Sequence, residues 1–330
     1  MTDWEGNWAI LEKEASRPGM SVRRVRPEER HDLFVGIEHP ALTRTFFIEV
    51  PRKLVQQVGV DMECTGFLVR REGVPDRPDW GRLVVRLQER RYAEVFSSLA
   101  ADVFSSIPPD ADDRGVLEHT MRRLVRWKQF MAARGEEGLS RQQRQGLYGE
   151  LWFLLSHAIP VCGVARAVAA WGGPRGRPQD FEFATSAVEV KTTTAVAPEG
   201  IQVASARQLD PPAEFTLLLL HIMLEERSGA GETLTALVSR VRAAAVGREL
   251  ELEDLLLQAG YLDADSARYS AAGYIVRRHR FFEAGARFPR LTEAMLPAGV
   301  TDVAYTISLA ACEPFTALDD KVHSAIGGVH

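Results

Sequence analysis

Asp180, Glu189 and Lys191 bring two carboxylates and one ammonium group into a short stretch of the chain. Polar and aromatic residues alternate over 180–183, and apolar and charged residues alternate over 187–191. Such a period of two predicts a pair of strands, each with one buried face.

Residues two apart in a strand share a face, so Glu189 and Lys191 are expected to lie together. Val188 and Val190 are then turned the other way, into a core. If the two strands pair in register as a hairpin, Asp180 reaches the side that carries Glu189 and Lys191. To bring these three side chains together, the two predicted strands have to form a hairpin within a half-buried sheet.

This set of groups is suited to metal-dependent cleavage of phosphodiester bonds. Mg²⁺ is held by one or two carboxylates together with waters and phosphate oxygens, so Asp180 and Glu189 are sufficient, with the Val190 carbonyl as a further oxygen. Lys191 is a compact charge that can orient water or neutralise a phosphate. Glu182 shares the face of Asp180 and is the alternative first ligand. An exposed ion pair between Glu189 and Lys191 is the non-catalytic alternative.

The run from Pro178 to Asp180, followed by that from Glu189 to Lys191, resembles the signature of the PD-(D/E)XK nuclease superfamily. It departs from that signature at Gln179, which separates the proline from the aspartate. Residues 146–155 and 171–174 resemble, in addition, a bacterial family of uncharacterised PD-(D/E)XK-motif proteins often encoded beside restriction or phage-defence genes.

The resemblance is specific from Leu139 to about Leu220 and thin beyond. It implies a restriction-endonuclease-like α/β core, with a mixed central sheet flanked by helices, and Mg²⁺ or Mn²⁺ as cofactor. It assigns a helix carboxylate to Glu150, in the metal shell directly or through water. It implies hydrolysis of DNA, expected to be duplex, and a defence setting with partner proteins.

Two other functions fit the same residues. A catalytically silent nucleic-acid-binding or scaffold subunit would keep the fold, and hydrolysis of RNA or modified DNA would use the same site. Paired cuts in duplex DNA often require two active sites, so a homodimer is compatible with the sequence, which contains no visible interface signal.

The helix that carries Glu150 is predicted from the residues themselves. Ser140 and Gln143 have the spacing of a capping box at a helix start. Glu150 lies about 60° from the centre of the apolar stripe, a boundary position from which it can face a sheet. The stripe consists of Leu147, Leu151, Leu154 and Ala158.

Further polar and basic residues are candidates for contact with phosphate. Gln202 and Ser205 follow the predicted hairpin and are auxiliary candidates for metal waters or phosphate, in a segment that also holds Gln208. Basic clusters elsewhere are solvated faces or phosphate contacts. The clusters are Arg122, Arg123, Arg126 and Lys128; Arg141 and Arg144; and Arg277 to Arg280.

The composition sets outer limits on the class of protein. The chain has 330 residues, of which 45% are hydrophobic and 26% charged, which is ordinary for globular domains. The net charge of −5 excludes coating of nucleic acid through bulk electrostatics. No apolar run is long enough for a membrane span, so a cytoplasmic protein without membrane contact is expected. Cys64, Cys162 and Cys312 lack paired spacing and are expected to be reduced and buried.

Two domains are predicted, a β-rich N-terminal module over 1–107 and the nuclease domain over 108–330, which ends in a strand-containing extension. In the module, 73–79 is expected to be a turn or exposed loop. Residues 215–222 form an apolar run typical of a buried central strand. The predicted N-terminal strands are 33–37, 45–50, 65–69 and 82–87; helices are expected over 233–245 and 249–259. Strands expected over 269–282 and 303–309 either extend the nuclease sheet or form a separate subdomain.

Overall fold

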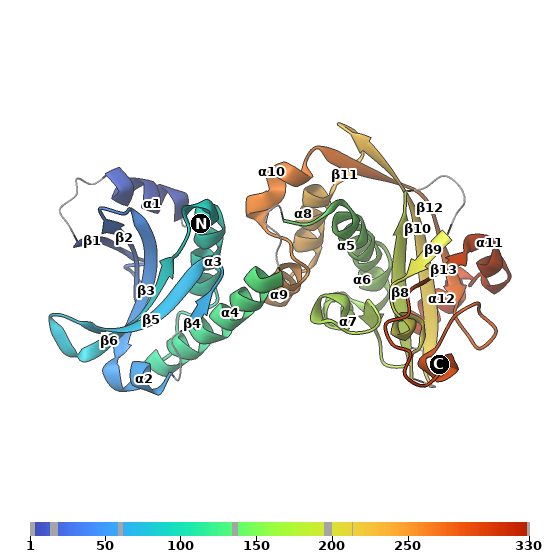
Figure 1. Ribbon diagram of the computed structural model, residues 1–330, viewed down its shortest axis with the longest axis horizontal. Coiled ribbons are helices and arrows are strands. Elements are labelled where there is room, and N and C mark those ends of the chain that lie inside the picture. Colours follow the sequence, from blue (N-terminus) through green and yellow to red (C-terminus); the bar gives the residue numbers. More distant parts are fainter. Residues whose placement is uncertain are drawn as a thin grey trace. The chain divides into compact units, whose positions relative to one another are not determined.

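The computed structural model describes residues 4–13, 19–58, 62–133, 138–194, 200–212 and 214–328. The chain has a mixed α/β fold and divides into two compact units, Met1–Arg134 and Gly135–His330 (Figure 1). The first unit includes the helix Asp113–Ala133, whereas the second domain predicted from the sequence begins at 108.

The first unit is built on a six-stranded antiparallel sheet with the order β1-β2-β3-β6-β5-β4. Its strands alternate, so that Val35, Phe46 and Val85 form one buried row across three neighbouring strands. Polar side chains such as Glu49 and Arg82 pair on the other face. The elements are α1 (Trp4–Lys13), β1 (Gly19–Val25), β2 (Asp32–His39), β3 (Thr43–Pro51), α2 (Arg52–Gln57), β4 (Met62–Cys64), β5 (Phe67–Val74), β6 (Arg77–Leu87), η1 (Arg90–Tyr92), α3 (Ala93–Ser105) and α4 (Asp113–Ala133).

The predicted loop over 73–79 is much shorter in the structure. Strand β5 continues to Val74 and β6 begins at Arg77, which leaves Pro75 and Asp76 as the turn of a tight hairpin. Proline and aspartate favour a turn, but they do not prevent their neighbours from pairing across it. Strands β1 and β4 and helices α1 and α2 were not predicted from the sequence.

The second unit contains a five-stranded mixed sheet with the order β11-β12-β10-β8-β7. Strand β10 runs parallel to β8 and antiparallel to β12, which confirms the prediction of a buried central strand. The elements up to the central strand are α5 (Arg141–Phe153), η2 (Leu154–Ala158), α6 (Ile159–Cys162), α7 (Val164–Ala170), η3 (Gly173–Arg175), β7 (Phe181–Glu182), β8 (Ser186–Thr193), β9 (Gly200–Val203), η4 (Ala206–Leu209) and β10 (Thr216–Ser228).

Of the later elements, β11 and β12 complete the same sheet. These later elements are β11 (Glu232–Thr233), α8 (Leu234–Ala244), α9 (Glu249–Gln258), η5 (Asp263–Asp265), α10 (Ser266–Tyr269), β12 (Ala272–Glu283), η6 (Glu293–Met295), β13 (Tyr305–Ser308), α11 (Leu309–Cys312), η7 (Glu313–Phe315) and α12 (Asp319–Gly327). The strand predicted over 269–282 begins only at Ala272, because Tyr269 lies in α10. The strand predicted near 303–309 pairs with β9 in a separate two-stranded sheet and does not extend the main one.

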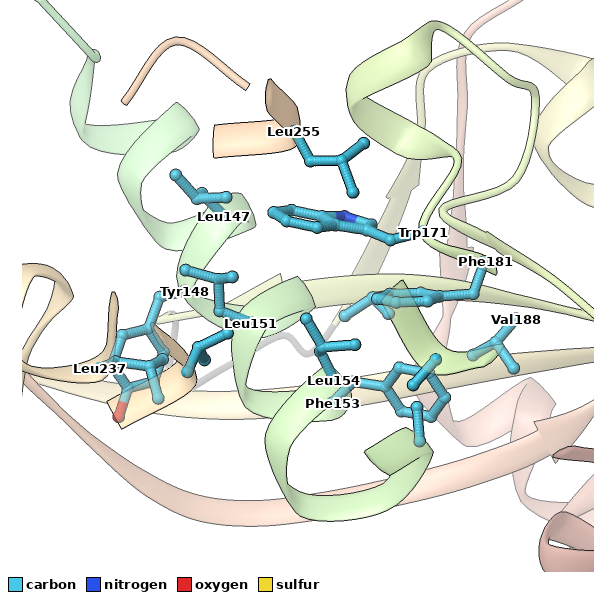
Figure 2. Close-up of a cluster of buried hydrophobic side chains, with 14 of the residues drawn as sticks. Leu147, Tyr148, Leu151, Phe153, Leu154, Trp171, Phe181, Val188, Leu237 and Leu255 are labelled. Atoms are coloured by element: carbon cyan, nitrogen blue, oxygen red, sulfur yellow. The ribbon is translucent and has the colours of Figure 1, made fainter. Parts of the chain in front are cut away.

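Two hydrophobic clusters cover the two faces of this sheet. Val188, Val190 and Leu220 face the larger cluster, which includes residues of α5 and α8 (Figure 2). Leu219 and Phe282 face the smaller cluster, which includes residues of β9 and β13. Each aliphatic side chain buried in this way contributes about 1.5–3 kcal/mol, so the sheet is a stable platform for the polar residues among them.

Other expectations concern cysteines and membranes. All three cysteines are free, as expected, but only Cys312 is buried, whereas Cys64 and Cys162 are partly exposed. Within the described parts of the chain, no helix combines the length and the apolar character that crossing a bilayer requires.

Candidate active site

The hairpin of β7 and β8 brings Asp180 beside Glu189. Phe181 lies opposite Val188, and Glu182 lies opposite Ala187, so the next position places Asp180 across from Glu189. The Asp180 carboxylate turns back over β8, where Oδ2 accepts a hydrogen bond from the Val190 amide at 2.8 Å. The in-register pairing that the sequence analysis required is therefore present.

Glu189 and Lys191 lie together on one face of β8. The Lys191 ammonium nitrogen is 2.8 Å from Glu189 Oε1, an ion pair outside hydrogen-bond geometry. The Glu189 side chain is 1% exposed, which rules out the exposed surface pair considered above. Its second oxygen, Oε2, has no hydrogen-bond partner among the described residues. A buried carboxylate oxygen without a partner is unfavourable, and a cation is the natural partner for it.

Helix α5 supplies the third carboxylate, Glu150. Its start is fixed by the predicted capping box, in which Ser140 Oγ accepts from the Gln143 amide and Gln143 Oε1 accepts from the Ser140 amide. At the other end of the helix, Glu150 Oε2 accepts a hydrogen bond from Trp171 Nε1 at 2.7 Å. Trp171 is itself fully buried in the larger cluster, as Figure 2 shows, so its indole is a fixed donor.

Gly172 and Gly173 lie beside the carboxylates of Asp180 and Glu150. Both amides donate to the Asp180 carbonyl, at 2.8 and 3.0 Å. A Cβ atom on Gly173 would lie 3.0 Å from both Asp180 Oδ1 and Glu150 Oε2. The two carboxylates therefore flank a small space that a side chain at position 173 would reduce.

Burial raises the pKa values of the three carboxyl groups, and repulsion between carboxylates adds to this for Glu150 and Glu189. Burial, followed by the charge of Asp180, raises the pKa of Glu150 to about 8, against the opposing effects of Trp171 and Lys191. The same two causes raise the pKa of Glu189 well above its usual value. Burial also raises the pKa of Asp180, although Lys191 and the Val190 amide oppose it. One lysine does not balance three carboxylates.

The donor set fits a hard divalent ion. Among the residues that the structure describes, no three His, Cys, Asp or Glu side chains converge closely enough to form a ligand set by themselves. Mg²⁺ does not need such a set, because waters and substrate phosphates complete its shell around one or two carboxylates. Asp180 and Glu189 supply these carboxylates, and a divalent charge would offset their repulsion.

Glu182, the alternative first ligand, is directed elsewhere. Its carboxylate accepts a hydrogen bond from Arg177 at 2.8 Å. Among the other candidates, Gln202 is exposed on β9, and Ser205 Oγ accepts from the Arg207 amide at the start of η4. The structure therefore groups Asp180, Glu189, Lys191 and Glu150 together, whereas Gln202 and Ser205 make no hydrogen bond to any of these four that the structure shows.

Gln208 is a residue at the site for which the sequence analysis predicted no role. Its Oε1 accepts a hydrogen bond from the Lys191 ammonium at 2.9 Å. The two residues are 17 positions apart, and no local spacing connects them. The only sequence signal was its place in the polar segment that follows the hairpin.

Some members of the basic clusters pair with acidic side chains. Arg123 is buried and donates to Asp102, which also accepts from Trp127, so it neither lies on a solvated face nor is exposed to phosphate. Arg141 pairs with Glu226 at 2.9 Å. Burial and local ion pairing determine whether these arginines are available to phosphate, and neither is visible in the sequence.

Asp180, directly before β7, and Glu189 and Lys191 on β8 together resemble the motif of the PD-(D/E)XK class. The family model described as "Putative PD-(D/E)XK family member, (DUF4420)" matches residues 4–310, and the chain belongs to this family. The match confirms the resemblance seen in the sequence and extends far beyond the segment from Leu139 to Leu220. No curated protein and no solved structure matches the chain.

Proposed function

We propose that this protein hydrolyses DNA phosphodiester bonds with Mg²⁺ or Mn²⁺, through a restriction-endonuclease-like core in its second unit. The observation that carries the proposal is the buried Glu189 oxygen without a hydrogen-bond partner, which lies beside Asp180 and Lys191. A bound divalent cation would favour the ionised forms of these three carboxyl groups, whose pKa values burial raises.

Each residue has a role in this proposal. Asp180, Glu189 and the Val190 carbonyl hold the ion, and Glu150 binds it through water. The bound ion supplies an acidified water and stabilises negative charge on the phosphate. Lys191 donates to the scissile phosphate or to the attacking water. Gly173 keeps the space between Glu150 and Asp180 open.

The test is a plasmid assay of wild type, Lys191→Ala and Glu189→Gln with Mg²⁺, Mn²⁺ or EDTA. Wild type should cut only with metal, and loss of the lysine should reduce the rate by about 10²–10³-fold, as for removal of one preorganised donor. Lys321→Ala is the matched control, because Lys321 pairs with Glu283 on the surface. Equal melting temperatures would show that the variants are folded. Cleavage by Lys191→Ala at the wild-type rate would contradict the proposal.

The alternative, a catalytically silent binding or scaffold subunit, predicts different results. It would shift DNA with or without metal and would tolerate Asp180→Ala. The defence setting, with its partner proteins, is part of the proposal because it rests on the resemblance in sequence. A plaque assay of cells that express wild type or Lys191→Ala tests it, and equal plaque numbers would contradict it.

A further inference from the structure

Gln179, the residue that departs from the Pro-Asp signature, is buried and fully engaged as a donor. The residue is only 3% exposed. Its amide nitrogen donates to the carbonyls of Arg207 at 2.7 Å and Gln208 at 3.3 Å. Both N–H groups of the amide are thereby used. Gln179 ties the segment that carries Asp180 to the short helix η4.

Gln208, held by this contact, points its own side chain toward the site. Its Oε1 accepts from the Ala204 amide at 2.9 Å and from the Lys191 ammonium at 2.9 Å. The backbone donor fixes the side-chain oxygen without any help from the lysine. The acceptor for Lys191 is therefore preorganised, because both its backbone and its side chain are restrained.

Lys191 has a long, flexible side chain that needs such restraint. Its ammonium donates a hydrogen bond to Gln208 Oε1 and forms an ion pair with Glu189 Oε1 at 2.8 Å. These two contacts define where the ammonium lies. An ammonium has three donors, so at least one remains for a phosphate oxygen or water.

We propose that Gln179 and Gln208 are a positioning pair for Lys191, which holds its ammonium ready to donate to the phosphate of a nucleic-acid substrate. This inference rests on the proposed function. Gln179, the extra residue between Pro178 and Asp180, carries the amide that anchors η4. The pair acts through Lys191 and does not touch the substrate.

The first experiment compares Gln208→Leu with Gln208→Glu in steady-state cleavage. The leucine removes the acceptor, and kcat should fall about 10–100-fold with little change in KM, as for loss of an outer partner of an active-site group. The glutamate keeps an acceptor oxygen and should retain most of the activity. In a Lys191→Ala background, Gln208→Leu should cause no further loss. Additive losses, or equal loss with glutamate, would overturn the inference.

Gln179 is tested by Gln179→Leu and by Gln179→Asn, whose amide is one methylene shorter and cannot reach both carbonyls. Both variants should show the same kcat loss without a KM change. Gln258→Leu is the matched control, since Gln258 is exposed at the end of α9. If the leucine variant does not fold, the asparagine variant decides. If the folded variant has the wild-type kcat, Gln179 has no role in positioning Lys191.

A readout without catalysis separates this inference from the proposed function. Acetylation of Lys191 in the metal-free protein, followed by mass spectrometry, should be several-fold faster in Gln208→Leu than in wild type or Gln208→Glu. If wild type cleaves nothing with any metal, the proposed function fails, yet the labelling rates still report the position of Lys191. An unchanged labelling rate in Gln208→Leu would overturn the positioning role.

Discussion

At the scale of residues, the site is a group of carboxyls whose protonation is coupled to folding. Glu150, Asp180 and Glu189 have raised pKa values because burial disfavours their charged forms. The folded metal-free protein therefore binds more protons than the unfolded chain between the unfolded pKa values near 4 and the folded values, about 8 for Glu150. The stability that these protons provide is lost as pH rises through the folded pKa values.

This coupling predicts that the melting temperature of the metal-free protein falls between pH 6.5 and pH 8.5. Glu150→Gln should melt higher than wild type at pH 8.5, by roughly 2–4 °C for each kcal/mol recovered, with a flatter pH dependence. His157 acts in the opposite direction at lower pH, because burial lowers its pKa to about 4, so the window begins at pH 6.5.

Differential scanning fluorimetry in EDTA measures this effect. The exposed Glu214→Gln is the matched control and should follow wild type. Added Mg²⁺ should reduce the fall, because it favours the ionised carboxylates. A wild-type melting temperature that rises over this range would contradict the assignment of protons to these groups.

Residue patterns predict some side-chain placements and miss others. The period of two was enough to put Glu189 and Lys191 on one face, because that rule is local. The contacts of Lys191 with Gln208 and of Glu150 with Trp171 were not predicted, since they join separate elements. Full burial of Glu189 was also missed, because it depends on how neighbouring strands and loops cover it.

At the scale of elements, α5 approaches the sheet closely at a glycine. A Cβ atom on Gly149 would overlap the methyl group of Thr192 and would lie 3.3 Å from Val190 Cγ1. Gly146, one turn earlier, has no such neighbour. The helix that carries Glu150 is therefore held against β8 at a distance that only glycine allows.

This packing predicts opposite effects for two identical substitutions in one helix. Gly149→Ala should destabilise the protein by about 1–3 kcal/mol through overpacking. Gly146→Ala should stabilise it by about 0.5–1 kcal/mol, because alanine loses less entropy in a helix. Urea denaturation measures both. Equal effects of the two substitutions would show that helix propensity alone determines the change in stability.

Element boundaries follow local signals where these exist. The capping box at Ser140 predicted the start of α5, and the apolar run near Leu218 predicted the central strand. Strand β1 was missed because exposed and arginine-rich residues interrupt its apolar pattern. The length of the loop at Pro75 was overestimated, because strand pairing across a turn is not visible in the turn residues alone.

At the scale of the whole molecule, the candidate site belongs to one unit. Asp180, Glu189, Lys191 and Glu150 all lie in the second unit, and both hydrophobic clusters on its sheet consist of residues from Leu139 onward. A core of this size is typical of an independent domain. The first unit has its own sheet and its own buried side chains.

We therefore expect a fragment from Gly138 to the C-terminus to fold alone. It should melt cooperatively, and its affinity for Mn²⁺ should equal that of the full chain, because it holds every proposed ligand. Calorimetry and Mn²⁺ titration check both expectations. A fragment without a cooperative transition would show that the first unit is required for folding.

The order of strands in the sheet sets when the site can form during synthesis. Leu219 on the central strand lies between Glu189 on β8 and Phe282 on β12. A nascent chain that ends before β12 leaves one edge of β10 unpaired and its apolar side chains open to water. The ribosome must release residues about a hundred positions beyond Asp180 before the carboxylates acquire their buried setting, so translation of the site and its assembly are separate events.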